Sequence, residues 1–292
     1  MAGQHYGVAS KATIVSLATM DCGGFTRMNW IISALNWIVS DGTASWTNNM
    51  AAPYNSWPVN PHLGMKSVIN WSGWAFLGET DTGVPQAIEQ AVAGVESYGI
   101  AVVTSADNYS MDSCEFAPNN VRYTVDAGGA VSGSVISVGA TERAIDAPDT
   151  LADSRWQDGT SGGMDTGSNS GACLNIWAPG ANIGSARHNG ALGVNPYGTA
   201  SGTSFAAPIV TGLIARKLEE PGVPQPKDLF LWLLSWGTYN DPNGNPLVKN
   251  TATPAGWFLD PYGYRYHSSV DTDGTKPMAY YTETCRSRPV GR

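Results

Sequence analysis

The most informative segment of this chain is Gly202-Thr203-Ser204-Phe205-Ala206-Ala207-Pro208-Ile209-Val210-Thr211-Gly212. Small residues at its start lead into an apolar segment, which predicts a helix that runs through Leu218. The N-terminus of a helix offers free N–H groups and a positive potential, and both would stabilise an oxyanion beside a nucleophilic Ser204. Gly-Thr-Ser is also an ordinary helix cap, which is the commoner role in proteins at large. The stretch alone leaves both interpretations open.

Strands and helices alternate upstream of this stretch. Apolar spacing predicts helices over residues 28–39 and 84–97, and a further helix near 228–234. Runs of β-branched and apolar residues predict strands over 12–18, 67–71, 100–104, 134–138 and 173–177. The alternation predicts an α/β fold with a mostly parallel β-sheet flanked by helices.

Polar residues follow two of the predicted strands. Functional groups of such sheets collect at the carboxyl ends of the strands, so residues at these ends are candidate site residues. One group is Ser72-Gly73, and the other is Ser105-Ala106-Asp107-Asn108.

The composition excludes several classes of protein. A chain of 292 residues with 42% hydrophobic residues is long enough to bury one large core. Its net charge of −8, with scattered Lys and Arg residues, disfavours a nucleic-acid partner. No apolar stretch approaches the roughly 20 residues that a membrane helix needs. We therefore expect a soluble protein that binds neither nucleic acid nor membrane.

The cysteines indicate the compartment. Cys22, Cys114, Cys173 and Cys285 lie far apart without a C-x-x-C pair, which excludes the usual zinc-knuckle spacing. Disulfides are the expected state, and they favour a secreted protein. The first residues show no signal peptide, so we expect any export signal to have been removed or to lie outside this chain.

Composition also divides the chain. Beyond about Gly237 it turns to Pro, Gly, Tyr and Asn, which predicts a domain over residues 1–238 and a C-terminal extension over 239–292 without a core of its own. Residues 41–63 are rich in Asn, Pro, Ser and Trp and predict a long surface loop. The Trp residues there indicate either an aromatic rim to a cleft or core packing.

Residues 202–212 match the subtilase serine signature G-T-S-x-A-x-P-x-V-x-G at every fixed position. Four further blocks resemble the proteinase K and aqualysin branch of that family, in the same order: residues 6–12, 20–24, 135–140 and 175–180. The α/β-hydrolase motif G-x-S-x-G is absent. Over roughly residues 3–238 the chain therefore resembles a subtilisin-like serine protease, lacking that fold's N-terminal strands.

The resemblance implies a role for each candidate residue. Ser204 would be the nucleophile, and Asn108 would be the side-chain donor of the oxyanion hole beside the Ser204 backbone N–H. The alternative for Asn108 is an ordinary turn residue. Ser105, Ala106 and Asp107 would line the substrate site. Ser72 and Gly73 would bind the substrate backbone as an added β-strand, with Gly23 and Gly24 on its other side.

The resemblance also implies two catalytic residues that this sequence does not show. The family order is Asp, His, Ser, and the His motif G-H-G-T-H-V-A-G precedes the block at residues 6–12. His5, His62, His188 and His267 match no histidine of that motif, and we expect all four to be surface or loop residues. A serine hydroxyl without a base is a poor nucleophile, so we expect negligible activity from the chain by itself.

Three functions are consistent with these residues. The first is a serine endopeptidase acting on polypeptides, whose Asp and His come from an N-terminal segment absent from this chain; a propeptide is a further possible partner. The second is a catalytically dead binding module of the same fold. The third is an esterase or polyesterase that uses the same serine, because acyl transfer to serine does not distinguish amides from esters.

Three finer expectations follow from the resemblance. Cys114 and Cys173 would form a disulfide, whereas Cys22 would lack its usual partner, with Cys285 as the alternative partner. Asn175 stands where the branch has a calcium-binding carboxylate, so we expect no cofactor beyond a weak structural calcium ion. Asp107 stands where the family has glycine, so it would either favour a basic substrate residue or point to solvent.

Overall fold

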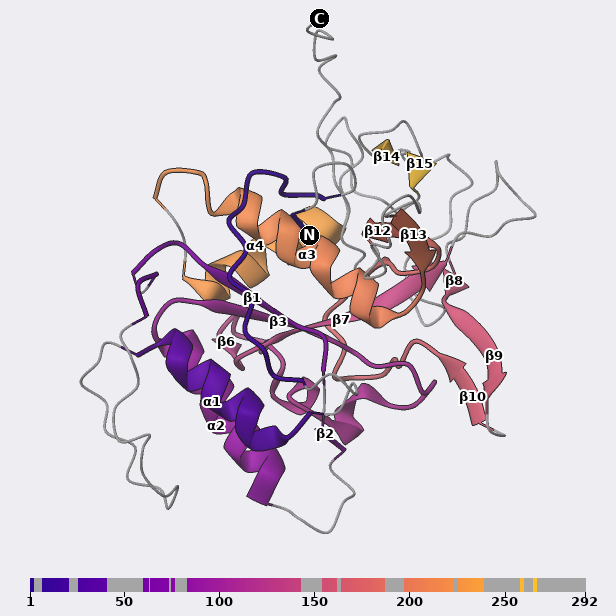
Figure 1. The fold of residues 1–292 in the computed structure, drawn as a ribbon, viewed down its shortest axis with the longest axis horizontal. Helices are drawn as coiled ribbons and strands as arrows, with labels where there is room; N and C mark the ends of the chain where they lie inside the picture. The colour runs from indigo at the N-terminus through magenta and orange to yellow at the C-terminus, as the bar shows by residue number, and fades with distance from the viewer. Residues whose placement is uncertain are drawn as a thin grey trace, which may run out of the picture.

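A parallel sheet runs through the middle of the molecule between two pairs of helices (Figure 1). The computed structural model describes residues 1–2, 7–20, 26–40, 60–62, 64–73, 75–76, 83–142, 154–161, 164–186, 197–222, 225–238, 258–259 and 265–266. The strand order is β1 (Val68–Trp71), β3 (Ala101–Ser105), β7 (Ile136–Glu142) and β11 (Ile176–Pro179), all parallel, with β8 (Ser154–Arg155) antiparallel to β7. The predicted α/β fold is confirmed.

Each face of the sheet carries one pair of helices. Helices α1 (Met28–Ile38) and α2 (Gly83–Ser97) cover one face, and α3 (Thr203–Lys217) and α4 (Pro226–Thr238) cover the other (Figure 1). The other described elements are short: β2 (Ala75–Phe76), η1 (Ser113–Glu115), β4 (Phe116–Ala117), η2 (Asn119–Val121), β5 (Thr124–Val125), β6 (Val131–Ser132), β9 (Gln157–Ser161), β10 (Met164–Gly167), β12 (Ile183–Ala186), β13 (Tyr197–Ala200), β14 (Phe258–Leu259) and β15 (Arg265–Tyr266).

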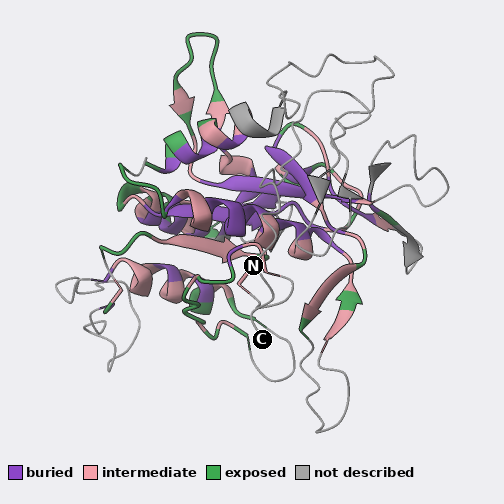
Figure 2. Ribbon diagram, turned by 90° about the horizontal axis from the view of Figure 1, so that it is seen from above, coloured by how far each residue is buried: buried purple, intermediate pink, exposed green. Residues whose placement is uncertain are grey.

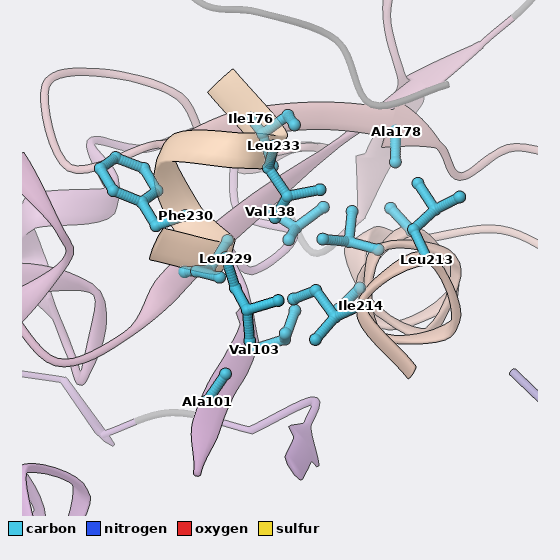
Figure 3. Close-up of a cluster of buried hydrophobic side chains, with 14 of the residues drawn as sticks. Ala101, Val103, Val138, Ile176, Ala178, Leu213, Ile214, Leu229, Phe230 and Leu233 are labelled. Atoms are coloured by element: carbon cyan, nitrogen blue, oxygen red, sulfur yellow. The ribbon is translucent and has the colours of Figure 1, made fainter. Parts of the chain in front are cut away.

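Successive side chains of β3 point to opposite faces of the sheet, and each face has its own hydrophobic core. Ala101 and Val103 pack with α3 and α4, whereas Val102 packs with α1 and α2. Figure 3 shows the first core, where Leu213 of α3 and Leu229 of α4 meet the strand side chains. Every residue of β3 is buried, and Figure 2 shows the buried strands between the helices. A strand covered on both faces needs an almost continuous apolar run, which residues 100–104 supply.

One predicted strand is wrong. Residues 12–19 form no strand; Ile14 is 59% exposed and Val15 46% exposed, and Met20 makes only an isolated bridge to Thr26. β-Branched residues favour a strand only when a neighbouring strand pairs with them and covers a face. Among the described residues, this segment has no such ladder.

Strand boundaries also differ from the prediction. β7 begins at Ile136 and extends to Glu142, beyond the predicted end at residue 138. β11 begins only at Ile176 and runs through Pro179, because β7 is its one partner in the described sheet and an edge strand tolerates a proline. Before Ile176, Cys173 forms a disulfide and Asn175 forms side-chain hydrogen bonds to Ser137 and Tyr123.

The proposed division at residue 238 stays a prediction. Within residues 239–292, the structure describes only the short antiparallel pair β14–β15. The predicted loop over 41–63 lies outside the described residues except for 60–62. No helix among the described residues is long and apolar enough to cross a membrane.

Candidate active site

Ser204 is the second residue of α3, in the turn where the chain enters that helix. Gly202 caps the helix with φ 139°, a conformation that favours glycine, and its N–H donates to Gly180 O at 2.8 Å. Ser204 is half-buried. The predicted helix N-terminus beside Ser204 is confirmed, and it provides the free N–H groups from which an oxyanion hole is built.

Thr203 joins this turn to the end of β3. Its N–H donates to Asn108 Oδ1 at 2.9 Å, and its hydroxyl donates to the same oxygen at 3.0 Å. Its hydroxyl also accepts from Asp107 N–H at 3.1 Å. Both hydrogen bonds use the carboxamide oxygen, so they leave the donors of the Asn108 NH2 group unused. Asn108 is therefore joined to the start of α3 through Thr203.

Ser72 reaches the same turn from β1. Its hydroxyl donates to Ser204 O at 3.3 Å and accepts from Asn70 Nδ2 at 3.2 Å. Asn70 Oδ1 in turn accepts from the Thr211 hydroxyl of α3 at 3.1 Å. Gly73 follows, where a Cβ atom would lie 2.5 Å from Trp71 Nε1. The structure thus brings Ser72 and Ser204 together, although the sequence places them far apart.

Asp107 is buried, not directed to solvent. It is 4% exposed and has φ 83°, a conformation that residues other than glycine rarely adopt. Its Oδ1 accepts from Asn108 N–H at 2.7 Å, whereas its Oδ2 is buried and has no partner. Burial raises the pKa of Asp107 to about 7, against a smaller lowering by the Asn108 hydrogen bond. The alternative in which this carboxyl points to solvent is wrong.

Ser105 and Ala106 precede Asp107 at the buried end of β3. Both are buried; Ala106 N–H donates to Val138 O at 2.9 Å, and Ser105 O accepts from Asn119 Nδ2 at 3.1 Å. Their role is thus to fix the strand end through the backbone. Gly23 and Gly24 lie outside the described residues.

Asn169 holds a second segment against the site. Its N–H donates to Asp107 O at 2.8 Å, and its Oδ1 accepts from Tyr109 N–H at 2.9 Å and Met111 N–H at 3.0 Å. Together with Asn119 and Thr203, it is a site residue that sequence reasoning missed. The available sequence signal was the polar run Ser168-Asn169-Ser170, which precedes Cys173.

The predicted disulfide is present. Cys114 and Cys173 are bonded with their Cα atoms 4.9 Å apart, close to the usual separation. The bridge fastens η1 to the residues before β11, next to the Asn169 contacts. Cys22 and Cys285 lie outside the described residues.

No general base for Ser204 is found in the described part of the chain. Among these residues, no His, Asp or Glu side chain forms a hydrogen bond with its hydroxyl. His62 lies in a turn before the amino end of β1, where its backbone N–H donates to Asn60 Oδ1. Ser204 lies at the opposite, carboxyl end of the strands. His5, His188 and His267 are outside the described residues.

The residues at the family's calcium position do not fit a strong site. Asn175 Oδ1 accepts from Ser137 N–H at 3.0 Å, and Asn175 Nδ2 donates to Tyr123 O at 2.7 Å. A neutral amide engaged at both ends offers a hard cation neither charge nor an unshared ligand. Within the described ranges, no cluster of three His, Cys, Asp or Glu residues could hold a metal ion.

Comparison with known proteins gives one consistent result. Residues 1–251 match the family described as Subtilase family. The chain is 30% identical over 248 residues to an extracellular serine proteinase of Thermus sp. (strain Rt41A), covering 85% of this chain and 45% of the relative. It is 32% identical over 226 residues to subtilisin-like protease 2 of Trichophyton tonsurans, covering 77% of this chain and 41% of the relative.

A solved structure agrees. A cold adapted subtilisin-like serine proteinase superposes with a TM-score of 0.53 at 27% identity, covering 82% of this chain and 67% of that one. The chain spans less than half the length of the two curated relatives above. The matched profile, the parallel sheet and the serine at the start of α3 together show that this chain belongs to the subtilase family.

Proposed function

We propose that this chain supplies the nucleophile and the oxyanion hole of a serine endopeptidase. Ser204 Oγ attacks the carbonyl carbon of a peptide bond, the amine leaves as an acyl ester forms on Ser204, and water then releases the acid. The Asn108 NH2 group and the Ser204 N–H bind the oxygen that becomes negative. Polypeptides are the proposed substrates, lying as an added strand beside Ser72 and Gly73.

The link between Thr203 and Asn108 carries the proposal. Two donors of Thr203 hold the Asn108 carboxamide oxygen, at 2.9 and 3.0 Å, so the carboxamide is fixed against the residue that precedes Ser204 before any substrate binds. If the start of α3 were only a helix cap, it would not need a fixed Asn108 carboxamide from the end of β3. Fixed donors are what stabilise a developing oxyanion without reorganisation.

The proton of the Ser204 hydroxyl needs a base, and the described residues provide none. We propose that the Asp and His of the family are supplied by polypeptide other than these residues. The purified chain then has negligible peptidase activity, since losing the triad partners of a subtilase relative costs about 10⁶-fold in turnover. That factor belongs to the relative and is carried over.

The test is covalent labelling of Ser204 by a fluorophosphonate, with imidazole added as an external base. We expect slow labelling of the wild-type chain, acceleration by imidazole, and none with Ser204→Ala. Asn108→Ala should slow labelling by about 10²-fold, the effect known for such a donor in this family. Casein hydrolysis should be undetectable. Rapid labelling without imidazole would contradict the missing base, and equal labelling of Asn108→Ala would contradict the oxyanion hole.

A binding module is the second candidate, and the missing base in the described residues favours it. The same experiment separates the two, because a module that has lost the chemistry should not label even with imidazole. An esterase would label as the peptidase does but would turn over p-nitrophenyl esters and not peptides in the presence of imidazole.

We also propose secretion and weak calcium binding. A relative named as an extracellular serine proteinase and the Cys114–Cys173 bridge support secretion, because disulfides persist in oxidising compartments. For calcium, the neutral Asn175 predicts weak affinity at most. Calorimetry that shows micromolar or tighter calcium binding would contradict this.

A further inference from the structure

A covalent bond closes the pair of segments that holds the backbone of Asn108. Residues 108–113 and 167–170 lie side by side, joined by two isolated parallel bridges. At one end of the pair, Asn108 O accepts from a backbone N–H of the second segment at 3.1 Å. At the other end, the residue that follows the first segment, Cys114, is bonded to Cys173. The disulfide therefore fixes the far end of the contacts that begin at Asn108.

The two cysteines of this disulfide lie in different surroundings. Cys173 is 6% exposed, whereas Cys114 is half-buried. Arg122 Nη1 donates to Cys173 Sγ at 3.6 Å. A guanidinium stays charged in proteins, so a positive charge lies against one sulfur of the bridge. Cys114 is thus the more accessible cysteine, and Cys173 is the one beside a cation.

We propose that Cys114 is a thiol-exchange site, at which a dithiol opens the bridge and thereby loosens the segment that carries Asn108. A thiolate of the dithiol attacks Cys114 Sγ, and a mixed disulfide forms as the Cys114–Cys173 bond breaks. The electron pair of the broken bond stays on Cys173 Sγ as a thiolate. The second thiol of the reagent then attacks the mixed disulfide and releases Cys114. In balance, the dithiol is oxidised to a disulfide and transfers two electrons and two protons to the cysteines.

Arg122 favours this direction of attack. A neighbouring cation lowers the pKa of a thiol, because it stabilises the thiolate. In thiol–disulfide exchange, a leaving thiol with a lower pKa departs faster. Attack at Cys114, with Cys173 leaving beside Arg122, is therefore the faster of the two routes, and the greater exposure of Cys114 favours the same route.

The bridge can form again, because other contacts keep Cys114 in place. Asp112 Oδ1 accepts from Cys114 N–H at 2.9 Å, and Ser113 N–H donates to Ser170 O at 2.7 Å. These hydrogen bonds do not use the sulfur atoms, so they persist when the disulfide opens. Opening thus removes the covalent closure without unfolding η1, and the change is reversible.

The consequence for catalysis rests on the proposed function. Without the disulfide, residues 108–113 are held by noncovalent contacts alone and open locally more often. An oxyanion donor is most effective when it is fixed before the reaction. The chain should therefore keep an oriented Asn108 in an oxidising compartment and lose part of that order where dithiols are present.

Reduction of the folded 292-residue chain by dithiothreitol tests the exchange site, with mass spectrometry of maleimide-quenched peptides as the readout. Arg122→Gln should slow the reduction of the Cys114–Cys173 bridge about fivefold, and Arg122→Lys should retain the wild-type rate. Glutathione, a monothiol, should leave its mixed disulfide on Cys114 and not on Cys173.

The matched control is Arg216→Gln, which removes another half-buried arginine with a neighbouring carboxylate and should leave the rate unchanged. A general loss of stability in Arg122→Gln would expose the bridge and speed its reduction. A slower rate therefore reports the leaving thiolate and not unfolding.

Two measurements on the reduced chain test the consequence. Hydrogen exchange at the amides of residues 108–113 should be faster than in the oxidised chain, independently of any chemistry at Ser204. Imidazole-assisted fluorophosphonate labelling of Ser204, after removal of dithiothreitol, should be about threefold slower and should recover on re-oxidation. The double variant Cys114→Ser, Cys173→Ser should label at the slower rate with or without dithiothreitol treatment, which excludes effects of the other cysteines.

The exchange site is wrong if dithiothreitol does not reduce the folded chain, if glutathione is found on Cys173, or if Arg122→Gln is reduced as fast as wild type. Its effect on the segment is wrong if hydrogen exchange of residues 108–113 is unchanged by reduction. If exchange and reduction behave as expected but Ser204 never labels, even with imidazole, the exchange site is supported and only the proposed function is rejected.

Discussion

Replacing Asp107 by asparagine should raise the free energy of unfolding, relative to wild type, more at pH 8 than at pH 5. The pKa of this carboxyl is raised from 3.8 to about 7 by burial, so between these pH values the folded chain binds a proton that the unfolded chain does not. The stability that this proton provides is complete below pH 3.8 and is lost as the pH rises through about 7. Asparagine does not titrate, so the variant lacks this dependence.

The magnitude follows from the size of the shift. Each pH unit within the window contributes about 1.4 kcal/mol, and about two units lie between pH 5 and the folded pKa. The free energy of unfolding of Asp107→Asn, relative to wild type, should therefore rise by about 3 kcal/mol from pH 5 to pH 8. The comparison cancels other titrating groups, which both chains share.

Guanidinium denaturation at pH 5 and pH 8 measures this difference, with Glu115→Gln as the control for loss of an exposed carboxylate. The control should shift by less than about 0.5 kcal/mol between the two pH values, as exposed substitutions do. If the stability difference between wild type and variant is the same at both pH values, Asp107 titrates alike in the folded and unfolded chain, and the prediction is wrong.

Three further changes test other contacts. Thr203→Val removes the hydroxyl that holds Asn108 and should slow imidazole-assisted labelling of Ser204 about fivefold, the equivalent of one hydrogen bond. Thr203→Ser should retain the wild-type rate, and a wild-type rate for Thr203→Val would contradict the positioning role. Replacing Cys114 and Cys173 by serine opens a loop of sequence separation 59 and should cost about 4 kcal/mol by urea denaturation, so a loss below about 1 kcal/mol would count against it. Gly212→Ala puts a Cβ 2.7 Å from the Val8 Cβ and should lower stability by about 1–3 kcal/mol, which unchanged thermal unfolding would contradict.

Much of the fold could be predicted from the sequence because its signals are local. Apolar periodicity placed the helices at 28–39 and 84–97 within a residue of α1 and α2. The strand at 12–18 could not be judged locally, since pairing with another segment decides whether a β-rich run becomes a strand.

The candidate site likewise contains residues that local sequence patterns predicted and others that they did not. The signature around Ser204 and the strand-end position of Asn108 were readable as patterns. The burial of Asp107 was not, because nothing in the sequence shows that residue 107 adopts a positive φ. The hydrogen bonds of Asn169 and Asn119 join segments far apart in the chain, and no periodicity records such contacts.

The hydrogen bonds that join Asp107, Asn108 and Thr203 have a consequence for how this part of the molecule opens. The amide protons of Asp107, Asn108 and Thr203 all donate within this one network, to Thr203, Asp107 and Asn108 respectively. None of the three can be released without disturbing an acceptor that another depends on. In native-state hydrogen exchange these amides should therefore open together as one cooperative unit, with a common free energy of opening, while the exposed segment around Ile14 exchanges independently and sooner.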